Sequence, residues 1–168
     1  MMRFAVLFLS LFALFYGVLF GSNFAWVMRW HAWEQYAIMA VLSQVVPPER
    51  IDTFSVWILP TYKVVITPLC DGLLPILVWW AYVWARSASI PRKLLWSLIG
   101  YAVLHAVNLM RIVAVVWIEW RYKEPSYFFY VHDLFGNLLL VVTVLALAWY
   151  FNQKVADSWY NHASQRSS

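Results

Sequence analysis

The sequence predicts an all-α polytopic membrane protein that crosses the membrane about four times. Of its 168 residues, 64% are hydrophobic and 12% are charged, whereas an average soluble domain is about 45–50% apolar and about 25% charged. The chain also contains 12 Trp residues, and Trp side chains concentrate where the apolar core of a membrane meets the lipid headgroups. The net charge of +4 is modest, and we expect it to mark topology rather than a surface for nucleic acid.

Four apolar runs are the expected spans, at residues 4–20, 68–85, 94–118 and 131–151. Each is close to the length of about 20 residues that a helix needs to cross a hydrocarbon core of about 30 Å. The first run also has the shape of a signal peptide. Residues 21–24 make a poor cleavage site, however, so we expect a retained helix.

The loop between the second and third runs predicts the orientation. It carries Arg86, Arg92 and Lys93 without any acidic residue, and such loops stay in the cytoplasm. Four spans then give an N-in and C-in protein of the cytoplasmic membrane, surrounded by lipid. We expect a single membrane domain over residues 1–168, divided into a first span (1–21), an outer or interfacial segment (22–67), a helical core that carries the candidate site (68–151) and a cytoplasmic tail (152–168).

Residues 22–67 are interrupted by charge too often to make two clean spans. We expect a short interfacial helix at residues 33–46, ended by the proline pair that follows it, and another helical turn at residues 52–57. Residues 62–67 are rich in β-branched side chains, so we expect extended chain there. A second helix that spans the membrane fully within this region is the alternative.

Cys70 is the only cysteine, so the chain forms no intramolecular disulfide and no thiolate cluster for a metal. It lies near the start of the second expected span, where Thr67 suits the N-cap and Pro68 the first helical position. The free backbone N–H groups of a first helical turn, together with the helix dipole, would favour its thiolate. The simpler alternative is a small packing residue, as many buried cysteines are.

Three residues suited to acyl chemistry are expected at one depth in the membrane. Cys70 begins its helix at the outer side, and Arg111 lies about 26 Å along the next span from its cytoplasmic end. His132 opens the last span at the same outer face. Simpler alternatives exist, because Arg111 can extend its charge to the headgroups and His132 with Asp133 can cap its helix.

Asn108 and His105 extend this polar group along the third span. They precede Arg111 by one and two helical turns, so the three side chains share one face of the helix. We expect Asn108 to orient Arg111 or a substrate. For His105 the alternatives are an interhelical hydrogen-bonding residue, a residue that supports the site from behind, or a ligand.

The chemistry that these residue types support is cysteine acyl transfer. Cys70 as a thiolate attacks a peptide carbonyl, His132 moves the proton, and Arg111 stabilises the oxyanion or orients the carbonyl. Asp133 either pairs with Arg111 or polarises His132. We expect neither a cofactor nor a metal in this reaction.

These residues resemble the exosortase/archaeosortase family of polytopic membrane transpeptidases. The resemblance covers about residues 51–151 and rests on three motifs: Cys70-Asp71-Gly72 at a helix start, the Asn-x-x-Arg-Ile pattern from Asn108 to Ile112, and His132 at the head of the last span. The order, spacing and membrane placement of these motifs match the family, and so does the basic loop between the first two.

The resemblance implies that Cys70 is the nucleophile of an outward-facing thiol protease, with Arg111 and His132 as its catalytic partners. It also implies exported substrates similar to PEP-CTERM proteins, which end in a short recognition motif, a transmembrane helix and a basic tail. Cleavage beside that helix would be followed by transfer of the acyl group to an acceptor.

The chain departs from the family in two ways, and it would be a short, divergent member. It lacks the additional N-terminal spans of longer members. Typical members also carry Ser or Thr at the position of Asp71, whose charge beside the thiolate would oppose ionisation of Cys70 unless Arg111 or another cation offsets it.

Two other classes of function would use the same residues. A non-catalytic membrane assembly subunit would use the polar cluster to hold a partner helix. A haem- or quinone-binding protein would use His105 and His132, although these two residues are expected at different depths.

Overall fold

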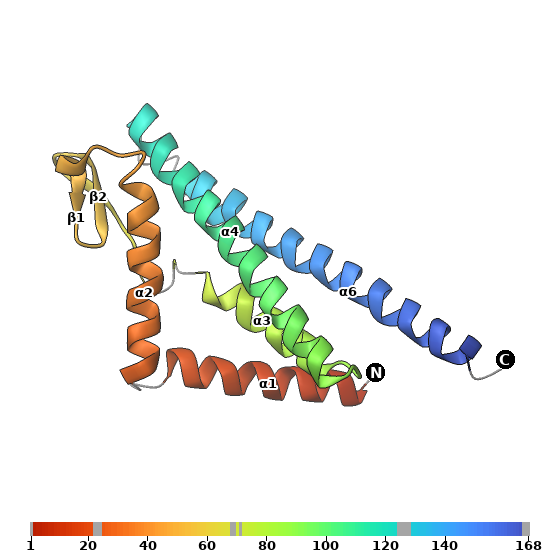
Figure 1. The fold of residues 1–168 in the computed structure, drawn as a ribbon. Coiled ribbons are helices and arrows are strands. Elements are labelled where there is room, and N and C mark those ends of the chain that lie inside the picture. Colours follow the sequence, from red (N-terminus) through yellow and green to blue (C-terminus); the bar gives the residue numbers. More distant parts are fainter. Residues whose placement is uncertain (1, 22–24, 68–69, 71, 124–128, 166–168) are drawn as a thin grey trace.

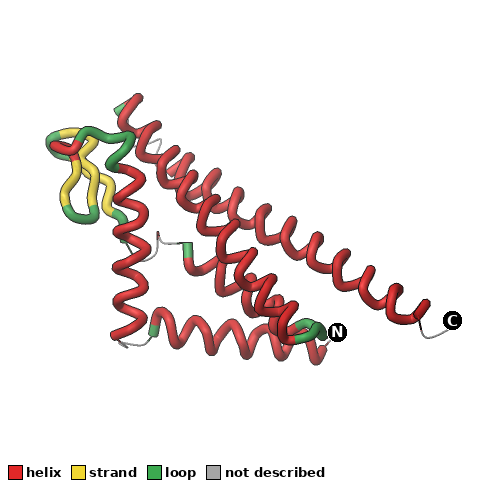
Figure 2. Tube along the Cα trace, in the orientation of Figure 1, coloured by secondary structure: helices red, strands yellow, loops and turns green. Residues whose placement is uncertain are grey.

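The computed structural model describes residues 2–21, 25–67, 70, 72–123 and 129–165, with side chains up to residue 154. The chain is mostly helical (Figure 1), with helices α1 (Met2–Phe20), α2 (Ala25–Leu42), α3 (Leu73–Ala85), α4 (Ile90–Tyr122) and α6 (Asn137–Gln165). A short helical turn η1 (Pro48–Arg50) and strands β1 (Ile51–Asp52), β2 (Ser55–Leu59) and β3 (Tyr62–Val65) lie between α2 and α3 (Figure 2), and a π-helical segment η3 (Phe129–Gly136) leads into α6.

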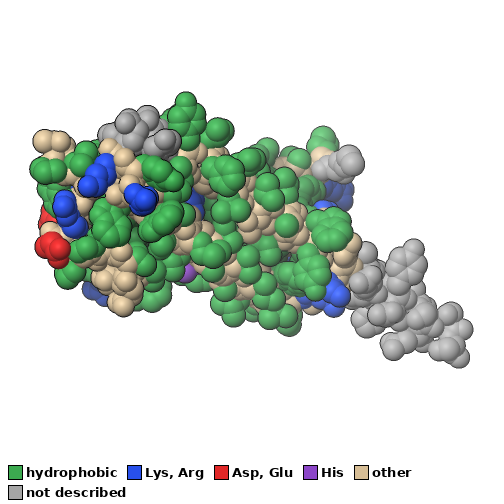
Figure 3. Space-filling view, turned by 90° about the horizontal axis from the view of Figure 1, so that it is seen from above, with side chains coloured by type: hydrophobic (Ala, Val, Ile, Leu, Met, Phe, Trp, Pro, Cys, Tyr) green, Lys and Arg blue, Asp and Glu red, His purple; other side chains and the backbone are tan. Residues whose placement is uncertain are grey.

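Three helices are long and apolar enough to cross a membrane. They are Met2–Phe20, Ile90–Tyr122 and the continuous helix Phe129–Lys154, which contain three of the four expected spans. Hydrophobic side chains cover most of the face shown in Figure 3, and Lys and Arg lie mainly towards its two ends. The fold therefore agrees with the predicted helical membrane class.

The expected span at residues 68–85 is shorter in the structure. Helix α3 begins only at Leu73 and has 13 residues, which corresponds to about 20 Å at 1.5 Å per residue. Gly72 precedes it with φ of 76°, a left-handed conformation that interrupts a right-handed helix. A side chain at Gly72 would also bring a Cβ to 2.7 Å from Cγ of Asn108. The close approach of α4 at this point therefore requires glycine.

The segment between the first span and Cys70 differs from the prediction in two places. Helix α2 covers Ala25–Leu42 rather than residues 33–46, and it ends before the proline pair. Residues 52–57 are not helical, because they contribute to strands β1 and β2. Val56 and Ile58 of β2 are buried in a core shared with α2 and α4, and burial of alternate residues favours a strand over a helical turn.

The extended chain expected before Cys70 is confirmed by strand β3. The three strands form an antiparallel sheet in the order β1-β2-β3, and Val64 and Ile66 anchor its last strand in the core that contains Ile112 and Val116 of α4. The end of β3 therefore lies beside α4.

Helix α3 packs closely against α4 through an indole and a glycine. Trp79 is fully buried, and its Nε1 donates a hydrogen bond to the carbonyl of Trp96 at 2.9 Å. A Cβ at Gly100 would overlap the indole of Trp79. This contact fixes the helix that follows Cys70 against the helix that carries Arg111.

One end of the molecule collects the start of α1, the loop between α3 and α4 and the later part of α6, as Figure 1 shows. Arg86 ties these helices together. Its guanidinium lies 4.8 Å from the ring centre of Phe4 and donates to the hydroxyl of Tyr82 at 2.8 Å. Tyr82 in turn donates to Oδ1 of Asn152 at 2.9 Å. The sheet and the end of α4 lie at the opposite end of the molecule.

Candidate functional site

Cys70 lies in the chain between the sheet and α3, and two hydrogen bonds shape that chain. Nε2 of Gln35 on α2 donates to the carbonyl of Ile66 at 2.9 Å. The N–H of Cys70 donates to the carbonyl of Thr67 at 2.8 Å, which makes a tight turn, and Oγ1 of Thr67 lies 3.4 Å from Sγ. The thiol is therefore presented from a turn that α2 holds in place.

This placement corrects the expected N-terminal helical position of the thiol. Helix α3 begins at Leu73 and its N-cap is Gly72, not Thr67. The free N–H groups of the first turn of α3 therefore begin three residues after Cys70 and do not account for its ionisation. The predicted roles of Pro68 and Asp71 fall on residues outside those that the structure describes.

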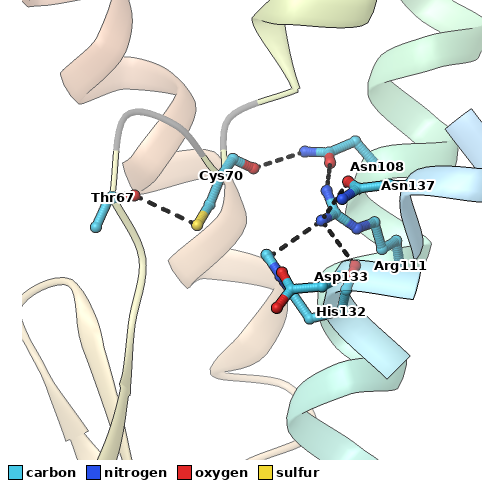
Figure 4. Close-up of polar contacts among 7 residues, drawn as sticks. All are labelled: Thr67, Cys70, Asn108, Arg111, His132, Asp133 and Asn137. Carbon is cyan, nitrogen blue, oxygen red and sulfur yellow. Dashed lines mark hydrogen bonds and ion pairs between the residues drawn. The ribbon is translucent and has the colours of Figure 1, made fainter. Parts of the chain in front are cut away.

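Asn108 connects Cys70 to Arg111. Its side chain is buried, and its Nδ2 donates to the carbonyl of Cys70 at 2.9 Å while its Oδ1 accepts from Nη1 of Arg111 at 3.2 Å. Asn108 therefore holds both the backbone of Cys70 and the guanidinium (Figure 4). The expectation that it orients Arg111 agrees with this geometry.

Arg111 is buried on α4 and reaches across to η3 and α6. Its Nη2 lies 3.1 Å from each of three acceptors, which are Nε2 of His132, the carbonyl of His132 and Oδ1 of Asn137. A Cβ at Gly136 would overlap Nε of Arg111. The missing side chain of Gly136 therefore makes room for the guanidinium beside His132.

Asp133 contacts His132 directly, and this contact favours one of the two roles expected of the carboxylate. Nδ1 of His132 lies 2.8 Å from Oδ1 of Asp133. A carboxylate only accepts at neutral pH, so Nδ1 carries the hydrogen and Nε2 carries the lone pair in the neutral ring. The lone pair is then on the nitrogen that faces Arg111, and the contact of Asp133 with Nδ1 fits the expectation that Asp133 polarises His132.

The thiol of Cys70 is more acidic than an ordinary cysteine. Burial alone would raise its pKa, but hydrogen bonds with His132 and Thr67 favour the thiolate more strongly, and the net pKa of Cys70 is lowered. The sulfur and the imidazole also line the same small cavity, whose volume is about 10 Å³. That is close to the smallest space that holds one water molecule, so a larger reactant must approach from the surface, where Thr67 and Asp133 are exposed.

His105 is placed in a different cluster on the same helix. Its Nδ1 lies 2.9 Å from Oε2 of Glu34 on α2, and Oε1 of Glu34 also accepts from Trp30 at 3.0 Å and from the hydroxyl of Tyr101. The interhelical interpretation of His105 fits this arrangement. A haem or quinone site that joins His105 to His132 does not fit, because His132 is engaged by Arg111 and Asp133.

Sequence reasoning missed three polar residues that support the site. Gln35 and Asn137 gave no signal, because each meets its partner only across the fold. Glu119 lies just beyond the expected span at residues 94–118, but α4 continues to Tyr122 and buries it completely. Burial and the carboxylate of Glu119 raise the pKa of Tyr62 to about 12, so this carboxylate links α4 to strand β3.

Among the residues that the structure describes, no group of three or more His, Cys, Asp or Glu side chains is arranged to hold a metal ion. No protein-family model matches the chain, and no curated protein or solved structure matches it.

Proposed function

We propose that this protein is a membrane-embedded cysteine peptidase or transpeptidase. The observation that carries the proposal is that Cys70 and His132 line one small cavity, while His132 is hydrogen-bonded to both Asp133 and Arg111. A thiol, an imidazole and a carboxylate in this order form the nucleophile, base and orienting group of covalent acyl transfer.

The reaction begins with transfer of the thiol proton from Sγ to Nε2 of His132, which leaves the electron pair on sulfur. The thiolate adds to the substrate carbonyl, and the oxyanion forms beside Arg111. One hydrogen of Nη1 is engaged by Asn108, and its second hydrogen is available to the oxyanion. His132 returns its proton to the leaving amine as the carbon–nitrogen bond breaks. Water or another nucleophile then adds to the acyl carbon and gives a proton to His132, and the carbon–sulfur bond breaks to release the acyl group from Cys70, which recovers the proton.

The proposed substrates are exported proteins with a C-terminal motif, a transmembrane helix and a basic tail. Two observations support an outward-facing site in the cytoplasmic membrane. The basic loop with Arg86, Arg92 and Lys93 lies at the end of the molecule that also holds the start of α1, and such loops stay in the cytoplasm. Cys70 is separated from that end by the length of α3. In this proposal the chain is a divergent relative of the exosortase/archaeosortase family.

The proposal is tested by co-expression with an exported protein that has such a C-terminus. Removal of its C-terminal helix is followed by gel shift and mass spectrometry. The Cys70→Ala variant should reduce cleavage to background, because no other thiol is present in the chain. The matched control is His31→Phe, which removes an imidazole bonded to the carbonyl of Leu19 at 3.0 Å, and it should retain cleavage.

The same experiment distinguishes an assembly subunit from an enzyme. A non-catalytic subunit would keep complex formation and processing in Cys70→Ala and lose both in Arg111→Leu. Processing that continues unchanged in Cys70→Ala rejects the proposed enzyme.

A further inference from the structure

One nitrogen of the Arg111 guanidinium, Nη2, lies within hydrogen-bonding distance of more acceptors than it has hydrogens. Nη2 carries two hydrogens. It lies 3.1 Å from Nε2 of His132, from the carbonyl of His132 and from Oδ1 of Asn137. The amide oxygen of Asn137 must face Arg111, because a guanidinium offers only donors.

This excess of acceptors matters because one of the three changes its character during the proposed reaction. Neutral His132, with its hydrogen on Nδ1 towards Asp133, accepts at Nε2. Once Nε2 has taken the proton of Cys70, it becomes a donor and no longer accepts from Arg111. The two hydrogens of Nη2 then match the two remaining acceptors, the carbonyl of His132 and Oδ1 of Asn137.

We propose that Asn137 is a positioning residue that holds Arg111 while His132 is protonated. In this proposal, which rests on the Cys70–His132 pair of the proposed function, Nη2 changes acceptors and the guanidinium stays in place. Asn137 is suited to this role because it accepts without a negative charge, so Arg111 keeps the field that favours a thiolate and an oxyanion.

Among the residues that the structure describes, the charged groups that act on Cys70 and His132 include Arg111 from α4 and Asp133 from η3. Three other described charged groups on neighbouring elements lie elsewhere: Glu119 acts on Tyr62, Lys63 lies 4.0 Å from Asp52, and Lys154 lies in the later part of α6.

The proposal predicts that loss of the acceptor makes Cys70 harder to ionise. Without Oδ1 of Asn137, Nη2 keeps donating to Nε2 of His132 and competes for the lone pair that takes the thiol proton. The Asn137→Ala variant should raise the midpoint of Cys70 alkylation by iodoacetamide by about 0.5–1 pH unit, with alkylation about three- to tenfold slower at pH 7. The measurement is made on purified full-length protein in detergent. Its single cysteine gives a signal without background, and the assay needs no substrate.

Three further variants separate this role from a packing effect. Asn137→Gln keeps an amide acceptor and should return the midpoint to within about 0.3 pH unit of the wild type. Asn137→Ser, whose hydroxyl is too short to reach Nη2, should behave as Asn137→Ala and replaces it if that variant does not fold. Asn152→Ala removes another asparagine acceptor from the same helix, which accepts a hydrogen bond from the hydroxyl of Tyr82 at 2.9 Å. This variant should leave the midpoint of Cys70 alkylation unchanged.

A double variant tests whether Asn137 acts through His132. In a His132→Phe background, Asn137→Ala should produce no further shift, because there is no lone pair left to compete for. An unchanged midpoint in Asn137→Ala overturns the proposal. Equal shifts in Asn137→Ala and Asn137→Gln, or in Asn152→Ala, do so as well. The proposed peptidase activity is judged separately by substrate cleavage, so failure of one proposal does not imply failure of the other.

Discussion

Among the described residues, helix α4 contributes to two polar clusters, and they differ in how their hydrogen bonds are distributed. The carboxylate cluster comprises Trp30, Glu34, Tyr101 and His105. The thiol cluster comprises Cys70, Asn108, Arg111, His132, Asp133 and Asn137. In the carboxylate cluster three donors from α2 and α4 surround one fully buried acceptor group, Glu34.

The thiol cluster has the opposite balance. Nη2 of Arg111 has fewer hydrogens than neighbouring acceptors. In the proposed reaction one proton moves between Sγ of Cys70 and Nε2 of His132. A cluster in which donors saturate one carboxylate fixes two helices together. A cluster with spare acceptors allows a proton to move while the heavy atoms stay in place. This difference supports a structural role for the carboxylate cluster and the proposed chemical role for the thiol cluster.

The largest expected effect separates the two clusters by stability. Glu34→Leu removes the acceptor of Tyr101 and Trp30 and leaves His105 without its carboxylate. We expect the free energy of unfolding to fall by about 3–5 kcal/mol, as when one partner of a buried pair is removed. Denaturant unfolding in detergent micelles measures this loss. The matched control Glu34→Gln keeps an acceptor oxygen and should lose clearly less.

The molecules of Glu34→Leu that remain folded should show an unchanged midpoint of Cys70 alkylation. A shifted midpoint with wild-type stability would contradict the division into a structural and a chemical cluster.

A smaller loss of stability is expected when Gln35 is changed. This residue follows Glu34 on α2 and supports the chain that carries Cys70 of the thiol cluster. Gln35→Leu leaves the carbonyl of Ile66 without the donor that holds it at 2.9 Å. We expect a loss of about 1–3 kcal/mol in unfolding free energy, the cost of an unsatisfied buried acceptor. Cys70 should also become more accessible, so its alkylation at a pH above its midpoint should be faster than in the wild type.

The control Gln44→Leu changes an exposed glutamine whose side chain contacts Ser43, and it should alter neither quantity. Equal behaviour of the two variants would show that Gln35 does not position the thiol.

The long helices were predictable because their signal is local. The runs at residues 4–20, 94–118 and 131–151 are continuous, and apolar length alone indicates a span. Run lengths and loop charge also predicted that Cys70 and Arg111 approach one level, since each helical residue adds about 1.5 Å. These two residues do meet, through Asn108.

The features that escaped prediction depend on partners far away in the chain. The strands at residues 51–59 bury Val56 and Ile58 against α2 and α4, and a short alternating segment does not reveal that surface. The start of α3 depends on Gly72, whose left-handed φ of 76° and contact with α4 appear only in the fold. In the sequence, Asn137 is a single polar residue near the start of an apolar helix. Its proposed role follows only from its contact with Arg111 in the fold.

The measurement that tests the central claim most directly is the pH dependence of Cys70 alkylation in the wild type and in His132→Phe. The interaction with His132 lowers the pKa of Cys70, so removal of the imidazole should raise that pKa and reduce the thiolate at neutral pH. We expect a wild-type midpoint below about 8.5, the ordinary value of a free thiol, and a rise of about one unit in His132→Phe, with alkylation at pH 7 about tenfold slower. The control His31→Phe should keep the wild-type midpoint. A wild-type midpoint at or above about 8.5 that does not change in His132→Phe would contradict an activated thiol at this site.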